Sequence, residues 1–135
     1  MFDELREMNE LINRKQERID ELRATLTSTG ISYSSDRVQT SLHDKMADLM
    51  CKIVVMENEL DAMIDDFSDM KSRAKRLIFT LNNEEWQDIV YTHYVEFKTF
   101  REIADRKGVT LNSVLLKNNR ALKVLKKYLD ETHNL

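Results

Sequence analysis

The chain has 135 residues, of which 33% are charged, with a net charge of −3, two glycines and no proline. This scarcity of chain-breaking residues favours long helices in an all-α fold, and the length allows one modest core or two small ones. Because no stretch of about 18 apolar residues occurs and no signal segment opens the chain, we expect neither a membrane-spanning nor a secreted protein, but a cytoplasmic one.

From residue 3 to residue 27, apolar side chains recur at alternating steps of three and four, which predicts a helix with a heptad seam. The one polar member, Lys15, either fixes the register or lies at the edge of the seam. The full seam is Leu5, Met8, Ile12, Lys15, Ile19, Leu22 and Leu26. Residues 27–36 are rich in Ser, Thr, Gly and Asp and predict a loop, after which Asp36 or Ser41 starts the next helix.

A longer helix is predicted from Leu42 to Leu77, because the same spacing continues there without a slip. Its seam is Leu42, Met46, Leu49, Ile53, Met56, Leu60, Met63, Phe67, Met70, Ala74 and Leu77. The lone cysteine, Cys51, has no intrachain disulfide partner, and its apolar helical surroundings predict a partly buried thiol.

The two predicted helices differ in length, so an antiparallel hairpin would leave about a third of the longer one without an intrachain partner. Met50, Val54, Val55 and Ile64 also lie outside the strict seam. Either a second chain or the C-terminal domain should cover these residues, and we favour a second chain. Residues 1–80 are thus expected to form a helical hairpin or coiled coil that assembles into a homodimer or a higher homo-oligomer. Aspartate in place of Met56 and Leu60, both mid-seam, is expected to split that assembly.

The segment 71–76 is basic, and it admits two interpretations. It either complements the dipole at the C-terminus of the long helix or contacts phosphate beside a DNA-binding domain. Further on, Asn82 and Glu85 predict the N-cap of a support helix. The face of that helix mixes aliphatic and aromatic residues, which favours a core over a base-stacking platform: Trp86, Ile89, Val90, His93 and Tyr94.

Another helix is expected to begin at Phe100, because Thr99 and Glu102 have the spacing of a capping box. It is expected to end at Gly108, since glycine readily takes the left-handed conformation that closes a helix. Val109 then packs back as the apolar residue after the cap.

Thr110 is a second predicted N-cap, and the helix after it carries apolar residues at helical spacing: Leu111, Val114, Ala121 and Leu125. Ala104 stands where the two helices must approach closely. Two helices joined by so short a turn are typical of a helix-turn-helix.

The charge is divided unevenly along the chain. Residues 1–70 hold 8 Lys/Arg and 16 Asp/Glu, a net −8, whereas residues 71–135 hold 13 and 8, a net +5. Residues 96–127, which contain the predicted helix-turn-helix, hold 9 basic and 3 acidic residues. Phosphate contacts supply most non-specific DNA affinity, so this segment is where double-stranded DNA is expected to bind.

Several short motifs in this region resemble the part of bacterial sigma factors that reads the −35 promoter element: Glu102-Ile103-Ala104, Gly108-Val109, Ser113-Val114 and Arg120-Ala121. The whole chain is similar in layout to small phage regulators of late transcription, the ArpU-like and RinA-like proteins, as is its segment Tyr33–Ser41. The resemblance implies a transcription regulator that works with host RNA polymerase in the bacterial cytoplasm. Asn118 departs from the pattern, because a sigma-like recognition helix usually carries an apolar residue there.

With Val114 pointing inward, a rotation of 100° per residue places Asn112, Leu116, Asn119 and Lys123 on the outer face and Ser113 and Arg120 on a flank. Recognition helices read bases with their N-terminal residues, so the base-reading candidates are Asn112, Ser113 and Leu116. The candidates for phosphate contacts are Lys117, Arg120, Lys123, Arg101 and Lys107.

Enzymatic chemistry is not expected, because the three histidines are widely separated and no phosphate loop or nucleophile motif occurs. The predicted organisation is an oligomerisation region over 1–80 and a DNA-binding domain over 81–135. Two other functions remain open: a small terminase-like DNA-packaging subunit, or a helical adaptor that binds protein only. No cofactor or metal is expected.

Overall fold

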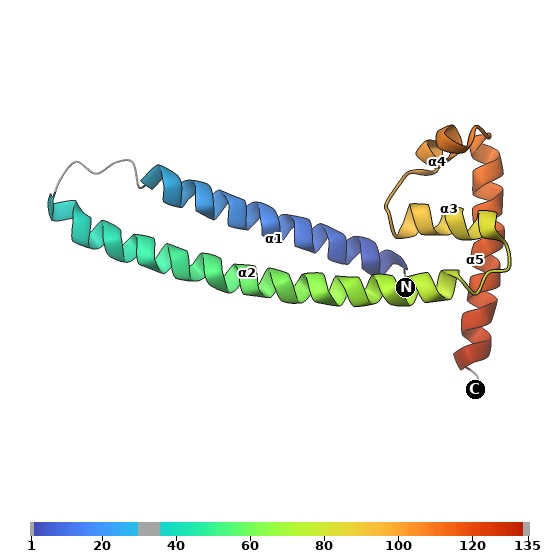
Figure 1. Ribbon diagram of the computed structural model, residues 1–135, viewed down its shortest axis with the longest axis horizontal. Helices are drawn as coiled ribbons and strands as arrows, with labels where there is room; N and C mark the ends of the chain where they lie inside the picture. Colours follow the sequence, from blue (N-terminus) through green and yellow to red (C-terminus); the bar gives the residue numbers. More distant parts are fainter. Residues whose placement is uncertain (1, 30–35, 134–135) are drawn as a thin grey trace. The chain divides into compact units, whose positions relative to one another are not determined.

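The described part of the chain is built entirely from helices, as predicted from the sequence (Figure 1). The computed structural model describes the backbone of residues 2–29 and 36–133, and the side chains of residues 2–28 and 43–132. The helices in that part are α1 (Phe2–Thr29), α2 (Asp36–Ile78), α3 (Glu84–Tyr94), α4 (Phe100–Lys107) and α5 (Leu111–His133). The fold is therefore all-α. None of these helices combines the length and apolar composition that a bilayer crossing requires.

The helices form two compact units, and their division falls within α2. The hairpin unit is Met8–Phe67, and the C-terminal unit joins Met1–Glu7 to Ser68–Leu135. The end of α2 belongs to the C-terminal unit because Ala74, Leu77 and Ile78 are buried there. This structural division differs in position from the functional boundary expected after residue 80, which stays a prediction.

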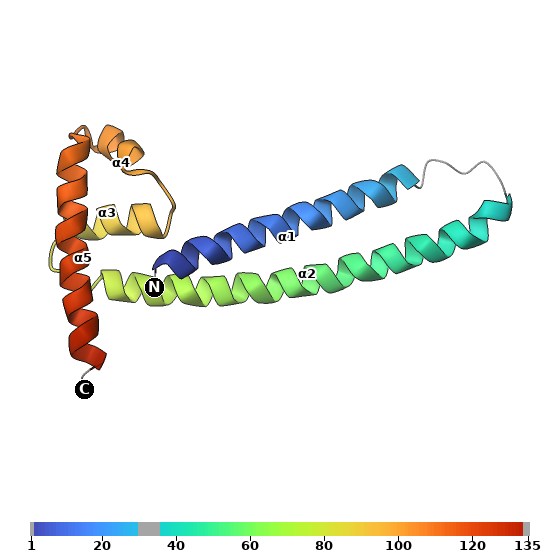
Figure 2. The same cartoon turned by 180° about the vertical axis from the view of Figure 1, so that it is seen from behind.

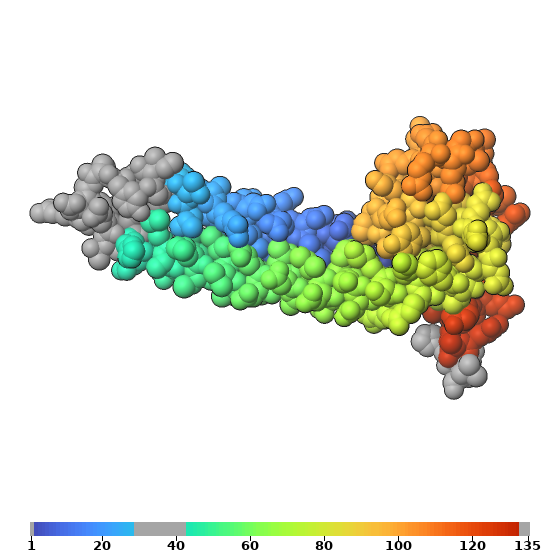
Figure 3. Space-filling view, viewed as in Figure 1, coloured from blue at the N-terminus to red at the C-terminus, as the bar shows by residue number. Residues whose placement is uncertain are grey.

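In the hairpin unit, α1 and α2 lie side by side, and their seams face each other (Figures 1 and 2). Buried Ile19 and Leu22 of α1 pack with Ile53 and Leu60 of α2, and the flanking seam residues pack against this cluster: Ile12, Leu26, Leu49 and Met56. In the space-filling view, the side chains of α1 and α2 close over this seam (Figure 3). Met56 and Leu60 therefore pack against α1 within the chain and help to hold the hairpin together, while their effect on assembly stays a prediction.

Charged residues line the edges of the hairpin seam. Lys15 forms an ion pair with Glu59, and Arg23 forms one with Glu57, so both pairs link α1 to α2. Lys15 therefore lies at the seam's edge, which is one of the two roles predicted for it.

A part of α2 outside the seam remains uncovered in the hairpin unit. Met50, Val54, Val55 and Ile64 are all exposed, with Val54 and Val55 at 55%. Cys51 is exposed as well, so the predicted partly buried thiol is wrong. Since the seam turns Leu49 and Ile53 toward α1, helical geometry directs the next residues away from it.

Residues 27–29, which were predicted to begin a loop, belong to α1, because this helix continues to Thr29. The hydroxyl of Thr27 donates to the carbonyl of Arg23, 3.0 Å away, as a threonine inside a helix does. Residues 30–35 lie outside the described part of the chain, and so does the first portion of the Tyr33–Ser41 segment. The helix that follows starts at Asp36, one of the two predicted positions.

In the C-terminal unit, α3, α4 and α5 pack around a small core. Ile89 of α3, Ile103 and Ala104 of α4 and Val114 of α5 form one buried cluster, with Phe100 packed against it. Val109 does not pack back as predicted, because it is 38% exposed. The predicted N-cap at Asn82 is also displaced by one residue.

The side chain that caps α3 is Asn83. Its Oδ1 accepts hydrogen bonds from the backbone N–H groups of Glu85, at 3.0 Å, and Trp86, at 3.2 Å. Because an N-cap side chain reaches the second and third amides of its own helix, the cap must directly precede Glu84.

Candidate nucleic-acid interface

The starts of α4 and α5 and the end of α4 are each fixed by a capping residue. Thr99 Oγ1 accepts from the N–H of Glu102 at 3.1 Å and starts α4, and Thr110 Oγ1 accepts from the N–H of Ser113 at 3.2 Å and starts α5. Gly108 closes α4 with a φ of 68°, in the left-handed region that glycine tolerates. The predicted helix starts and the predicted glycine cap are confirmed.

The short turn brings α4 and α5 into close contact. Ala104, which is 3% exposed, and Ile103 lie against Val114, which is fully buried. The N–H of Val109 donates to the carbonyl of Ala104 at 3.1 Å, which ties the turn to the end of α4. The start of α5 is therefore held at a fixed position against α4.

The outer face of α5 has the exposure expected from its helical phase. Asn112, Leu116, Asn119, Arg120 and Lys123 are all exposed, Leu116 at 51%, while Ser113 is half-buried. Val114 is buried on the opposite side, as assumed in the prediction. A polar and cationic surface with one apolar side chain thus runs along the first half of the helix.

Two of the predicted phosphate contacts are engaged with carboxylates of α3. Lys107 Nζ lies 2.6 Å from Asp88 Oδ2, and Lys117 Nζ lies 2.5 Å from Glu85 Oε1. Arg106 approaches Asp88 as well, at 3.8 Å. Through these ion pairs the two lysines link α4 and α5 to α3.

The other predicted cations are turned toward solvent. Arg101, Arg120 and Lys123 are exposed, and they take part in no ion pair with any side chain in residues 2–28 and 43–132. Lys127 is exposed too and continues the line of Leu116, Arg120 and Lys123 along α5. The sequence prediction missed Lys127, although its spacing of four from Lys123 was a usable signal.

Two half-buried aromatic residues of α3, His93 and Tyr94, make ring contacts within this unit. His93 stacks on Phe100 with ring centroids 3.7 Å apart, and its Nδ1–H donates to the carbonyl of Lys98 at 2.7 Å. Burial lowers the pKa of His93, although the Lys98 carbonyl acts in the opposite direction. This half-buried ring packing agrees with the predicted core role of the helix face that carries His93.

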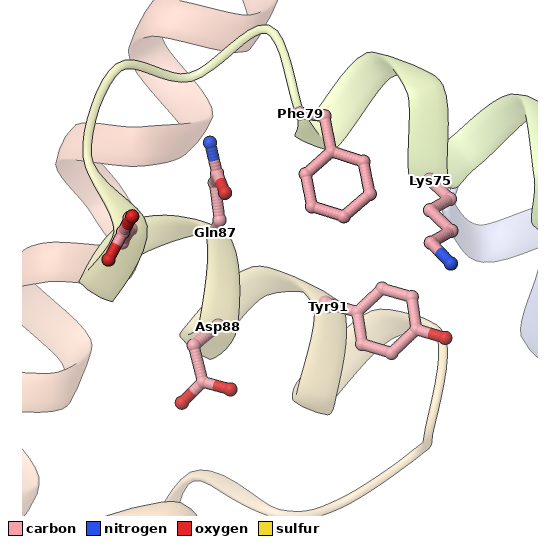
Figure 4. A pocket seen from close by; sticks show the side chains of 6 residues that line it. Lys75, Phe79, Gln87, Asp88 and Tyr91 are labelled. Atoms are coloured by element: carbon pink, nitrogen blue, oxygen red, sulfur yellow. The ribbon is translucent and has the colours of Figure 1, made fainter.

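A separate pocket of about 440 Å³ lies between the end of α2 and α3 (Figure 4). It is lined by Lys75, Phe79, Glu84, Gln87, Asp88 and Tyr91. Two of its polar groups have internal partners, since Gln87 Nε2 donates to the Leu81 carbonyl and Asp88 pairs with Lys107. Among the described residues, no three His, Cys, Asp or Glu side chains are grouped closely enough to hold a metal ion.

Comparison with known proteins identifies a family for this chain. Neither a curated protein nor a solved structure matches the chain significantly. The model of a family described as "Protein of unknown function (DUF1492)" matches residues 25–126, from the end of α1 to Lys126 in α5. This match covers most of the chain: the end of α1, all of α2, α3 and α4, and α5 as far as Lys126. The chain therefore belongs to the DUF1492 family.

Proposed function

We propose that this protein is a sequence-specific DNA-binding transcription regulator of phage or prophage origin that acts in the cytoplasm of a bacterial host. The observation that carries the proposal is the outer face of α5. It follows a glycine-capped turn and presents Asn112, Leu116, Arg120 and Lys123 to solvent without internal ion pairs in the described part of the chain. We interpret α4, the turn and α5 as a helix-turn-helix.

In this proposal, the first turns of α5 enter the major groove. Asn112 can pair bidentately with an adenine, and Leu116 can contact a thymine methyl group. Arg120 and Lys123, one and two turns further on, neutralise phosphates at the groove edge, and Arg101 does so from α4. Lys107 and Lys117 contribute less than expected from the sequence, because Asp88 and Glu85 compete for them.

The proposed assembly is a homodimer, joined through the exposed face of α2. Ala47, Met50, Cys51, Val54 and Val55 share one face of the helix, since the pairs 47/51, 50/54 and 51/55 are each four residues apart, and all are exposed in the hairpin unit. An apolar helical stripe of this kind is typical of a helix–helix contact. Two linked DNA-binding units can engage two half-sites, which supplies the specificity that one such unit lacks.

The test is a selection of genomic fragments bound by the purified full-length protein, combined with gel shifts at several salt concentrations. The proposal predicts a limited set of enriched sites that share a sequence motif, with promoter-proximal positions if polymerase is the partner. An adaptor that binds protein only would produce no salt-dependent shift. Enriched fragments confined to a packaging site would favour the terminase-like alternative.

A further inference from the structure

Asn118 occupies an unusual place on α5. The inward stripe of this helix consists of Val114, Asn118, Ala121 and Leu125, and all four are buried. Asn118 is 4% exposed and is the one amide in this apolar stripe. Its Oδ1 is buried and has no hydrogen-bond partner among the described residues. A buried amide that is only partly hydrogen-bonded weakens the folded state, so its presence needs a reason other than stability.

The other amide atom of Asn118 joins α5 to α3. Its Nδ2 donates to the hydroxyl of Tyr94 across 3.4 Å, a long hydrogen bond. The Tyr94 ring is itself held from two sides, because it stacks on Phe2, with centroids 4.7 Å apart, and meets the edge of His93 at 4.6 Å. Tyr94 is therefore a fixed point against which Asn118 is placed.

Directional contacts of this kind differ from the rest of the α5 core. Apolar burial is non-directional, so Val114, Ala121 and Leu125 alone would allow α5 small rotations about its axis at little cost. A single buried asparagine is known to select one register in helical assemblies because its hydrogen bond is lost in the others. The bond from Asn118 to Tyr94 can select one rotation of α5 in the same way.

Small rotations matter on the outer face. The helix with its side chains is about 10–12 Å across, so a rotation of about 20° moves an outer side chain by about 2 Å. Hydrogen bonds to bases require distances of about 2.7–3.2 Å and do not survive such a displacement. We propose that Asn118 and Tyr94 are positioning residues that set the rotation of α5, and thereby decide which bases Asn112 and Leu116 read. This inference rests on the proposed DNA-binding function.

The experiment uses the full-length protein with Tyr94→Phe, Asn118→Leu and the double variant. Tyr94→Phe keeps the ring that stacks on Phe2, and Asn118→Leu fills the site with an apolar side chain of related shape. Leu125→Ala is the matched control, because it removes buried volume from the same stripe without changing a polar contact. Measured quantities are the thermal midpoint, the ratio of affinities for the selected site and random DNA, and the backbone amide spectrum of α5.

The double variant is expected to keep a thermal midpoint at or above that of the wild type, because a poorly satisfied buried amide has been removed. Its affinity for random DNA should be unchanged, since the exposed cations remain, while the specificity ratio should fall by about tenfold or more. Its α5 amide resonances should shift, broaden or split. Leu125→Ala should lower the midpoint and leave the specificity ratio within about twofold.

A double variant with the wild-type specificity ratio and the wild-type α5 spectrum would overturn the inference. A double variant that fails to fold would overturn it too, because the pair would then hold the fold together instead of choosing a rotation. Failure of the proposed function is recognised separately. In that case the wild type itself shows no preference over random DNA, and the α5 spectrum of the double variant still decides whether Asn118 and Tyr94 set the helix rotation.

Discussion

Phe2, at the start of α1, stacks on Tyr94 of α3, with ring centroids 4.7 Å apart and ring planes inclined by 22°. These residues are 92 positions apart in the sequence, yet both belong to the C-terminal unit. Leu5, one turn further along α1, is 1% exposed in the same unit. The first turns of the chain are therefore part of the structural unit that carries α5.

We predict that Leu5→Ala destabilises the C-terminal unit by about 2–5 kcal/mol, as expected when a fully buried leucine is truncated. Denaturant unfolding of the full-length chain, followed by the fluorescence of Trp86, would measure the change. Glu7→Ala, an exposed change in the next turn of α1, is the control and should stay within about 0.5 kcal/mol of the wild type. A Leu5→Ala protein that unfolds at the wild-type midpoint would show that residues 1–7 are dispensable for this unit.

The exposed cations of α5 should determine how strongly DNA binding depends on salt. Arg120→Ala and Lys123→Ala should each lower the slope of log K against log salt by about 0.9, because each removes about one phosphate contact. The affinity for random and selected DNA should fall to a similar extent. If gel shifts or fluorescence anisotropy showed unchanged slopes for both variants, this face of α5 would not be part of the DNA interface.

The ion pair between Lys117 and Glu85 gives a prediction of the opposite sign. Glu85→Gln removes the carboxylate that engages Lys117, so this cation becomes available to phosphate and the salt slope should steepen by up to about 0.9. The pair is partly exposed, so the accompanying loss of stability should stay below about 1 kcal/mol. Glu84→Gln, which neutralises the neighbouring carboxylate, is the matched control for the change in net charge. Equal changes in the salt slope for the two variants would mean that removal of the Glu85 carboxylate does not make Lys117 available to phosphate.

Self-association should depend on the exposed stripe of α2 and not on the hairpin seam. Val54→Asp should convert the proposed dimer to a monomer and leave the helix content intact, because Val54 is 55% exposed within the chain. Leu60→Asp should instead reduce the helix content, since it buries a charge between α1 and α2. Light scattering and circular dichroism on the same samples would separate the two effects. A wild-type protein that is monomeric at micromolar concentration would contradict the assignment of this stripe.

The lowered pKa of His93 predicts that the C-terminal unit loses stability in mild acid. The unfolded chain binds a proton near pH 6.5, whereas the folded protein resists protonation because His93 is buried. The contribution is therefore fully present above about pH 6.5 and is lost as the pH falls through the lower pKa of the folded state. Unfolding free energies measured from about pH 7.5 to pH 5.5 should show this loss, and His93→Phe should remove the part due to His93. Identical pH profiles for both proteins would assign the loss to other groups.

Much of the fold could be predicted from local signals. The seams of α1 and α2, the caps at Thr99 and Thr110 and the left-handed Gly108 all depend on contacts within a few residues or on strict periodicity. For the same reason, the helical phase of α5 predicted which residues are exposed. The cap at Asn83 was missed by one residue, because Asn82 and Asn83 are chemically equivalent as caps and only the backbone conformation distinguishes them.

What the sequence could not provide were contacts between distant segments. Lys107 and Lys117 look like free cations in the sequence, and only the packing of α3 places Asp88 and Glu85 beside them. Periodicity likewise does not predict that Phe2 stacks on Tyr94. Nor does it show which helix Met56 and Leu60 pack against. Heptad spacing identifies an apolar face, but it does not say whether that face meets the same chain or another.

The most direct test of whether the outer face of α5 reads DNA sequence compares fragment selection by the wild type and by Asn112→Ala. The wild type should enrich sites that share one motif. Asn112→Ala should lose the preference at a single position within that motif while its salt slope stays unchanged, because a base contact and not a phosphate contact has been removed. Selection by the wild type that enriches no motif, or an Asn112→Ala profile identical to that of the wild type, would contradict this role of α5.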